Sequence, residues 1–581
     1  MDRSIDRSHD GESGGIGRLD GKIDQPTIQL VKMVPREART DSLLKSSALM
    51  AAGTVVSRLT GFARTLVMAA AIGVGTLADS YQVANVLPTM IYVLVGGGAL
   101  NAVFIPQLVR AMKDDEDGGE AYANRLLTLV TVLLGSVTAL CVLGAPYLVH
   151  ALSPDIASDP RRMAVTVAFA RYCLPTMFFM GIHVVMGQIL NARGRFGAMM
   201  WTPVLNNIIA ITTFAAFIWA FGTVSTSKMT ARNISPAGVR LLGVGTLLGL
   251  TVQAVSMIPY LRETGFRLRL RFDWRGHGLG KAAGLAKWTL LFVLANQLGM
   301  IVVTQLATKA GAVAEARHQT GTGITAYNYA LLLWQMPQAI ITVSVMTAVL
   351  PRISRAAHEN DIGAVRSDIS YGLRTSAVAI VPCAFAFLCV GMPLATLLYT
   401  GSGAGAENIG YTLMAFGLGL VPFSAQYVIL RGFYAYEDTR TPFYNTVIVA
   451  VVNAGAAGLS YWLLPARWAV TGMAAGYGVA YVVGVAVAWR RLRHRLGGDL
   501  DGSRVVRTYT RLVVACVPAA AVAGCAGFAA LGLLGSSAGG SVLALFAGTA
   551  CFLGIFSAIA GALRIEELTA LTGMMRARLG R

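Results

Sequence analysis

Two arginines stand in a stretch that otherwise has the composition of a membrane-spanning helix. The stretch SRLTGFARTLVMAAAIG, residues 57–73, carries Arg58 and Arg64 and no acidic residue. An arginine near the centre of a bilayer costs about 3 kcal/mol on insertion scales. A guanidinium stays charged and donates hydrogen bonds in pairs, which suits phosphate. The two residues therefore predict a wet cavity that binds an anion.

Helical geometry decides whether both arginines can face one cavity. Six residues of helix rotate the side chain so that Arg58 and Arg64 point about 120° apart. Both reach one cavity if it is wide or if the helix bends, and Gly61 between them makes a bend cheaper. Ligand contact is the favoured role for Arg58. For Arg64 there is an alternative, a pair with Asp79 that holds a gate across the turn between the first two spans.

For the other polar residues in the apolar segments, the sequence indicates a role less clearly. Arg171 either contacts a ligand or extends to the membrane interface. His183 is predicted to contact neighbouring helices rather than to relay protons. Lys287 and Lys309 are predicted to anchor the ends of their span at the membrane interface. The predicted spans also carry several amides, which favour bridges between helices: Asn206, Asn207, Asn296, Gln297, Asn328, Gln335, Gln426 and Asn453.

The composition is that of an integral membrane protein. The 581 residues are 55% hydrophobic and 13% charged, with a mean hydropathy of +0.60; soluble domains have about 25% charged residues. The net charge of +19 is explained by membrane topology rather than by nucleic acid. The seven cysteines lie in apolar segments without a CxxC pair, so neither zinc nor a disulfide framework is indicated. A Walker A motif and HExxH are both missing.

Fourteen windows are long and apolar enough to cross a bilayer. They are 46–73, 78–109, 123–151, 165–192, 199–222, 240–261, 283–311, 323–350, 369–399, 410–436, 442–464, 468–490, 507–534 and 540–563. Alternate loops are rich in arginine, which predicts that both termini are cytoplasmic. Residues 1–45 are polar and predict a flexible cytoplasmic tail rather than a signal peptide.

Two short motifs recur at similar spacing. TPVLN (202–206) resembles TPFYN (441–445); Pro203 follows Pro106 by 97 residues, and Pro442 follows Pro351 by 91. In each set the first proline would end a second span and the second would open a fifth. The pattern predicts two parallel six-helix repeats, an N-lobe (46–275) and a C-lobe (276–498), with two further helices and a short cytoplasmic C-terminus in 499–581. Chance recurrence of proline and asparagine at helix ends is the alternative.

Several segments resemble the MurJ/MviN family of lipid II flippases, within the multidrug/oligosaccharidyl-lipid/polysaccharide exporter superfamily. They are RLTGFAR (58–64), Asp79, GGALNAVFIP (97–106), LNARGRF (190–196), SVMTAVLPRIS (344–354), LLYTGSG (397–403) and GFYAYEDTRTP (432–442). The resemblance covers about residues 44–495. It implies an all-α fold of fourteen helices in two lobes around a cationic cavity, with the last two helices forming a groove for a lipid tail.

The resemblance also implies residue roles. Arg58, Arg64 and Asp79 match charged family positions, and the cavity arginines would hold a pyrophosphate. The chain departs from the family at Tyr92, where an arginine is common, and at Leu332 and Gln335, where an arginine and a glutamate are common. Arg171 and Arg431 are the cations to examine as replacements. The substrate-binding candidates are Arg58, Arg64, Asp79, Arg171, Tyr92, Gln335 and Asn328. The structural motif residues are Gly61, Pro106, Pro203, Pro351, Gly432, Asp438 and Pro442.

The function that the resemblance implies is transport, not catalysis. By alternating access, the protein would move the undecaprenyl-pyrophosphate-linked peptidoglycan precursor to the outer leaflet of the bacterial cytoplasmic membrane. Lipid II and membrane lipid are the implied partners, with cell-wall synthesis or division proteins as further candidates. No cofactor or metal is implied, and coupling to a monovalent cation or to the membrane potential stays open. The alternatives are export of a teichoic or capsular unit, or a non-transporting scaffold for wall synthesis.

Overall fold

The computed structural model describes residues 36–97, 108, 111–112, 117–273, 281–319, 321–400, 405–535 and 538–568. Over these residues the chain is helical, and none of them lies in a β-strand. Residues 1–49 and 50–581 form two units, and the contacts that position the site belong to the second. Helix α1 begins at Arg36, within the predicted tail. Pro106 lies outside the described residues.

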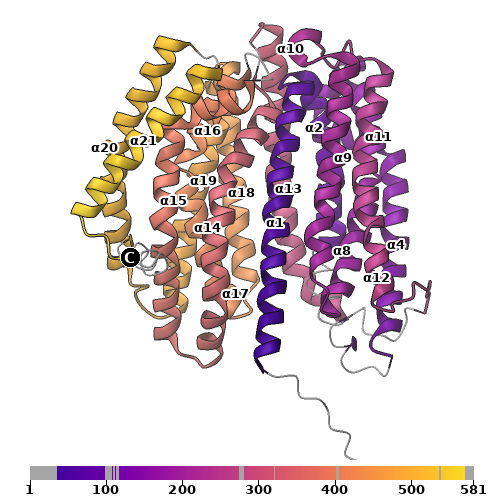
Figure 1. The fold of residues 1–581 in the computed structure, drawn as a ribbon, viewed down its shortest axis with the longest axis horizontal. Coiled ribbons are helices and arrows are strands. Elements are labelled where there is room, and N and C mark those ends of the chain that lie inside the picture. The colour runs from indigo at the N-terminus through magenta and orange to yellow at the C-terminus, as the bar shows by residue number, and fades with distance from the viewer. Residues whose placement is uncertain are drawn as a thin grey trace, which may run out of the picture. The chain divides into compact units, whose positions relative to one another are not determined.

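The helices follow the predicted apolar windows in order (Figure 1). The first group is α1 (Arg36–Ile72), α2 (Thr76–Tyr92) with the π-helical turn η1 (Val93–Gly97), α4 (Glu120–Leu143), α5 (Ala145–Leu152), α6 (Pro154–Ser158), α7 (Pro160–Cys173), α8 (Thr176–Ala192), α9 (Gly197–Phe221), α10 (Val224–Ser227), α11 (Pro236–Val255) and α12 (Met257–Glu263). The second is α13 (Lys281–Ala316), α14 (Ile324–His358), α15 (Ile362–Leu398), α16 (Gly405–Gly417), α17 (Leu420–Ala435), α18 (Arg440–Leu463), α19 (Ala466–Arg495), α20 (Gly502–Leu534) and α21 (Ala538–Ala562).

The described helices contain twelve that are long and apolar enough to span a membrane, or thirteen if the bent pair α16–α17 counts as one span. The two members of that pair meet at 49°. Helix α2, the predicted second span, has 17 residues and ends where the described backbone passes into η1. The all-helical polytopic class is confirmed, whereas the count of fourteen stays a prediction.

Corresponding helices of the two predicted repeats make corresponding contacts. Helix α9 packs on α11, as α18 packs on α19. Helix α9 also contacts α1, where Asn207 donates to the Ser57 carbonyl at 3.0 Å and to Thr60 Oγ1 at 3.1 Å and Gly61 leaves room. Helix α13 likewise packs on α18, with Gly299 beside Ala450. The last two helices, α20 and α21, pack on each other and on α15.

Pro351, the predicted end of the second span of its repeat, does not end the helix. Pro351 lies inside α14, which continues to His358. A proline in a helix costs about 3 kcal/mol through a lost hydrogen bond and a steric clash. Three residues around Pro351 are buried in one apolar cluster, namely Val349, Ile353 and Ala357. The free energy gained by their burial offsets the cost of the proline. Its partner in the repeat, Pro442, lies in the first turn of α18, where a missing N–H costs little.

The motif GFYAYEDTRTP builds the turn between α17 and α18. Asp438 accepts hydrogen bonds from the Thr441 backbone N–H at 3.0 Å and from Thr441 Oγ1 at 2.8 Å, and it pairs with Arg495. Burial acts to raise the pKa of Asp438, but these hydrogen bonds and the Arg495 charge outweigh it and hold the pKa below its usual value. At the other end of the motif, a Cβ on Gly432 would lie 2.9 Å from Ile369 Cδ1 and 3.1 Å from Leu492 Cδ2.

Gly432→Val is therefore expected to destabilise the packing of α17 on α15 and α19 by about 1–3 kcal/mol, because the added methyls overpack a filled contact. The thermal unfolding midpoint of the purified protein in detergent measures this. Gly458→Val on α18 is the matched control, since a Cβ there meets nothing within 4 Å. Equal midpoints for the two variants would contradict the packing role of Gly432.

Candidate functional site

The two helix groups are joined at one end by a carboxylate that caps a helix of the other group. Asp79, buried near the start of α2, accepts a hydrogen bond from the Thr325 backbone N–H at 2.9 Å and another from Thr325 Oγ1 at 2.6 Å. Thr325 lies in the first turn of α14, where helix N–H groups lack partners and the helix dipole favours a negative charge. Gly323 makes the approach feasible, because a Cβ there would lie 2.3 Å from Asp79 Oδ2.

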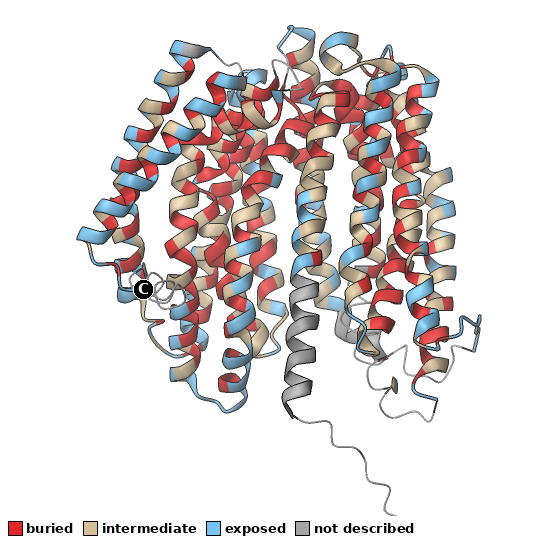
Figure 2. Cartoon of the chain, viewed as in Figure 1, coloured by how far each residue is buried: buried red, intermediate tan, exposed pale blue. Residues whose placement is uncertain are grey.

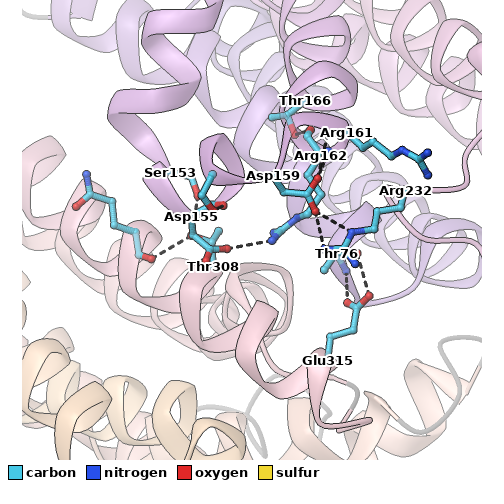
Figure 3. Close-up of polar contacts among 12 residues, drawn as sticks. Thr76, Ser153, Asp155, Asp159, Arg161, Arg162, Thr166, Arg232, Thr308 and Glu315 are labelled. Atoms are coloured by element: carbon cyan, nitrogen blue, oxygen red, sulfur yellow. Dashed lines mark hydrogen bonds and ion pairs between the residues drawn. The ribbon is translucent and has the colours of Figure 1, made fainter.

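A second carboxylate makes the reciprocal contact. Glu315, near the end of α13, accepts from the Thr76 backbone N–H at 2.9 Å and from Thr76 Oγ1 at 3.0 Å, at the start of α2 (Figure 3). Nearby, Ser153 and Thr308 share a hydrogen bond of 2.9 Å between the groups. We call this region, defined by Thr76, Asp79, Glu315 and Thr325, the closed end. Figure 2 shows that buried residues continue from one group to the other here, at the top of the view.

The pair between Arg64 and Asp79, the alternative considered for Arg64, does not form at the closed end. The carboxylate of Asp79 is bonded to Thr325, and the charges within its reach are those of Arg162 and Glu315. Asp79 therefore acts in this structure as a cap between the helix groups. Direct contact of Asp79 with a substrate stays a prediction.

Arg64 lies next to residues of both groups. Its guanidinium is within electrostatic reach of the phenols of Tyr81 on α2 and Tyr329 on α14. Tyr329 in turn stacks on Tyr399, with ring centroids 5.1 Å apart. In the part of the chain that the structure describes, Arg64 has neither an ion pair nor a hydrogen bond. It is thus a partly buried charge without a counterion beside the junction of the groups.

Arg58 is the more accessible of the two. It is exposed on α1 and has no hydrogen bond or ion pair among the described residues. At 1.5 Å per residue it lies about 9 Å farther from the closed end than Arg64. The neighbouring residues Ser57 and Thr60 are held by Asn207, so this turn of α1 is fixed on α9 while the Arg58 side chain stays free. That both arginines line one chamber stays a prediction.

Two other predicted site residues come together in a hollow of about 320 Å³ between α13, α14, α18 and α19. Asn328 and Gln335 both line it. Three further amides share the lining, namely Asn296, Gln297 and Asn453, together with tyrosines. Gln297 also donates to the Met90 carbonyl of α2 at 3.1 Å, which links this amide hollow to the first group. Uncharged donors and acceptors of this kind suit sugar hydroxyls and peptide amides.

The remaining candidates lie elsewhere. Tyr92 is buried in an apolar cluster within the first helix group, with Tyr122 and Leu134. Arg171 is exposed on α7 and unpaired among the described residues. Arg431 lies over the rings of Tyr427 and Tyr434, 4.5 and 5.8 Å from their centroids. The replacement of family arginines by Arg171 or Arg431 stays a prediction.

Sequence reasoning missed Arg162, which is 5% exposed at the closed end. One of its nitrogens bonds Asp155 Oδ2 at 3.0 Å, while Nε and Nη2 are buried without a hydrogen-bond partner. It lines a hollow of about 180 Å³ together with Thr76, Arg232 and Glu315. The sequence offered little indication of its burial. Arg162 precedes the predicted fourth span, and an arginine there is expected to be an exposed loop residue.

The fold is similar to that of two solved membrane proteins. A solved structure titled "Lipid II flippase MurJ, inward closed conformation" matches with a TM-score of 0.66 at 17% identity, over 89% of this chain and 99% of that one. An inward-facing multidrug transporter of the MATE family, in the MOP superfamily, matches with a TM-score of 0.58 at 18% identity, over 76% of this chain and 98% of that one.

The family model described as "Lipid II flippase MurJ" matches residues 68–542, and the chain belongs to that family. The "Probable lipid II flippase MurJ" of Rhizobium meliloti is 27% identical over 456 residues, covering 77% of this chain and 81% of the relative. The protein of the same description from Haemophilus influenzae is 26% identical, covering 69% and 78%. The matched range includes Asp79, Asn328 and Gln335 but begins after Arg58 and Arg64, whose assignment therefore depends on their own geometry.

Loss of the Asp79 cap is expected to open the closed end. Asp79→Ala removes two hydrogen bonds to a charged acceptor, each worth about 1.5–3 kcal/mol. The labelling rate of a cysteine introduced at the buried Ser80, measured with a membrane-impermeant maleimide and mass spectrometry, should rise by about tenfold or more. Asp368→Ala is the control. It breaks an ion pair between Asp368 on α15 and Arg352 on α14, both within the second group, and should leave the labelling rate unchanged. A rate unaffected by Asp79→Ala would contradict the capping role.

Proposed function

We propose that this protein translocates lipid II, the undecaprenyl-pyrophosphate-linked peptidoglycan precursor, from the inner to the outer leaflet of the bacterial cytoplasmic membrane. The observation that carries the proposal is Arg58, an exposed and unpaired cation on an apolar helix, six residues from the equally unpaired Arg64. Anionic groups are the natural partners of such charges, and a diphosphate accepts the paired hydrogen bonds of guanidinium. Membership of the lipid II flippase family supports the substrate.

The arginine distribution supports an orientation. Arg352 and Arg355 lie near the end of α14, and Arg490–Arg495 near the end of α19; both are remote from the closed end. By the positive-inside rule that basic end faces the cytoplasm. The closed end then faces the outside, and both termini are cytoplasmic. In this orientation the structure corresponds to a state that is sealed toward the outer leaflet.

The proposed mechanism is alternating access without a covalent step. From the cytoplasmic side, Arg58 and then Arg64 draw the pyrophosphate toward the closed end, while Asn328 and Gln335 contribute hydrogen bonds to uncharged parts of the headgroup. Outward release requires that the caps at Asp79 and Glu315 break. The substrate shifts this equilibrium only by its difference in affinity for the two states.

The membrane potential is the proposed driving force. An inside-negative potential favours outward movement of an anion by about 2.3 kcal/mol per charge per 100 mV. Coupling to a monovalent cation is the alternative that the sequence left open. The charge of the pyrophosphate itself would couple transport to the potential.

Arg58→Ala is expected to abolish translocation of lipid II in vesicles that contain the purified protein alone, because the first contact with the pyrophosphate is lost. Arg58→Lys should retain part of the rate, since it keeps the charge but not the paired donors. Headgroup accessibility of labelled lipid II measures both. Arg267→Ala, in the loop after α12, removes an exposed arginine from the same predicted side and should leave the rate unchanged.

Membrane insertion and abundance must match the wild type for each variant. Normal translocation by Arg58→Ala would exclude the cationic role. If the wild-type protein alone does not move lipid II but moves another polyprenyl-linked glycan, the assigned substrate is wrong.

A further inference from the structure

A second concentration of positive charge lies away from Arg58 and Arg64. A hollow of about 1000 Å³ opens among the ends of α17, α18 and α19, remote from the closed end. Five basic side chains line it, with a single carboxylate, Asp438. They are Arg440, Arg490, Arg491, His494 and Arg495. We call it the basic hollow.

The carboxylate in the basic hollow is already in use. Asp438 accepts from the Thr441 N–H and hydroxyl and pairs with Arg495. In the described part of the chain, Arg440, Arg490 and Arg491 have no carboxylate partner, and one terminal nitrogen of Arg491 is buried without a hydrogen bond. The positive-inside rule accounts for cations at this end of the helices, but not for their convergence on one hollow with an unsatisfied buried donor. The hollow is therefore complementary to an anion.

An apolar groove begins beside the basic hollow. It has a volume of about 320 Å³ between α13 and α18, and Leu298, Phe443, Val447 and Val451 are among the residues that line it. Gly299 and Ala450 line both this groove and the amide hollow, and they meet where α13 approaches α18. The groove therefore adjoins the amide hollow, and the exposed side chains of Leu298 and Val451 place it on an exposed face of the second helix group.

Aromatic side chains join the groove to the basic hollow. Trp288 of α13 lies with its ring centroid 5.6 Å from Phe443, which lines the groove, and 5.9 Å from Tyr444, which lines the hollow. The Arg440 guanidinium lies 5.4 Å from the Trp288 centroid and 5.7 Å from that of Tyr444. Trp and Tyr concentrate at the level of lipid headgroups. The basic hollow then lies at headgroup depth and the groove at acyl-chain depth.

We propose that an anionic phospholipid binds here, with its phosphate in the basic hollow and one acyl chain in the groove. Basic pockets between transmembrane helices are suited to anionic headgroups, and the adjoining groove selects a lipid over a free anion. Such a lipid bridges α13 and α18 on the surface of the second group. The site contains none of the residues proposed to contact the transported headgroup, although its groove adjoins the amide hollow, and it goes beyond the proposed function.

The test compares lipids that remain bound to the purified full-length protein, measured by native mass spectrometry. Phosphatidylglycerol should be retained and phosphatidylcholine should not. Arg440→Gln/Arg491→Gln should lower retention of phosphatidylglycerol by about tenfold. Arg262→Gln/Arg269→Gln removes the same charge from exposed positions of the first group and should have no effect. Equal losses for the two pairs, or equal retention of both lipids, would overturn the proposal.

A second variant tests the acyl chain. Val451→Trp fills the groove and should lower phosphatidylglycerol retention several-fold, whereas Val479→Trp, at an exposed position of α19, should not. Millimolar inorganic phosphate should fail to displace the lipid. If phosphate displaces phosphatidylglycerol and Val451→Trp has no effect, the hollow is a simple anion site. If lipid II selectively displaces phosphatidylglycerol, the hollow belongs to the transported substrate. Either result overturns the proposal. Unchanged thermal midpoints establish that the variants are folded.

Discussion

The structure depends on one constraint, which is the cost of a guanidinium charge in an apolar span. Arg58 and Arg64 have no ion pair among the described residues, so water or an anion must stabilise them. Two helix groups that met along their whole length would exclude both. The groups are tied by polar contacts at the start of α2, and Gln297 adds one hydrogen bond to Met90 near the end of that helix; Arg58 lies on the side away from the closed end. A charge that needs an anion is thus placed where one can enter.

The hydrogen bonds at the closed end can be replaced by hydrogen bonds to water. Asp79 and Glu315 each satisfy N–H groups at the start of a helix in the opposite group. Water can take over the same N–H groups when the helices separate, which lowers the polar part of the cost of opening. Apolar residues of both groups, such as Leu77 and Tyr327, also share one buried cluster, so opening costs apolar burial as well. Alternating access requires such a difference of a few kcal/mol between states. The basic hollow is remote from this junction and lies among three helices of a single group.

Hydropathy predicted where helices run, because crossing a bilayer requires about 20 apolar residues whatever their partners. It could not predict which way side chains face. Tyr92 is therefore buried within one group, whereas Asn328 and Gln335 share a hollow. The preference of proline for helix ends led to a wrong prediction at Pro351. The burial of residues beyond Pro351 outweighs the cost of a proline inside α14. The bond between Asp79 and Thr325 joins residues 246 positions apart, and the buried Arg162 looked like a loop charge; both depend on tertiary packing that no local pattern encodes.

The most direct test of the central claim is the affinity of the purified protein for lipid II at low and high salt. Wild-type binding should be tight and should weaken at high salt, since screening reduces attraction between exposed charges. Arg58→Ala/Arg64→Ala should bind weakly at both salt concentrations. Equal affinity and equal salt dependence for the wild type and the double variant would contradict the claim that these guanidinium groups hold the pyrophosphate.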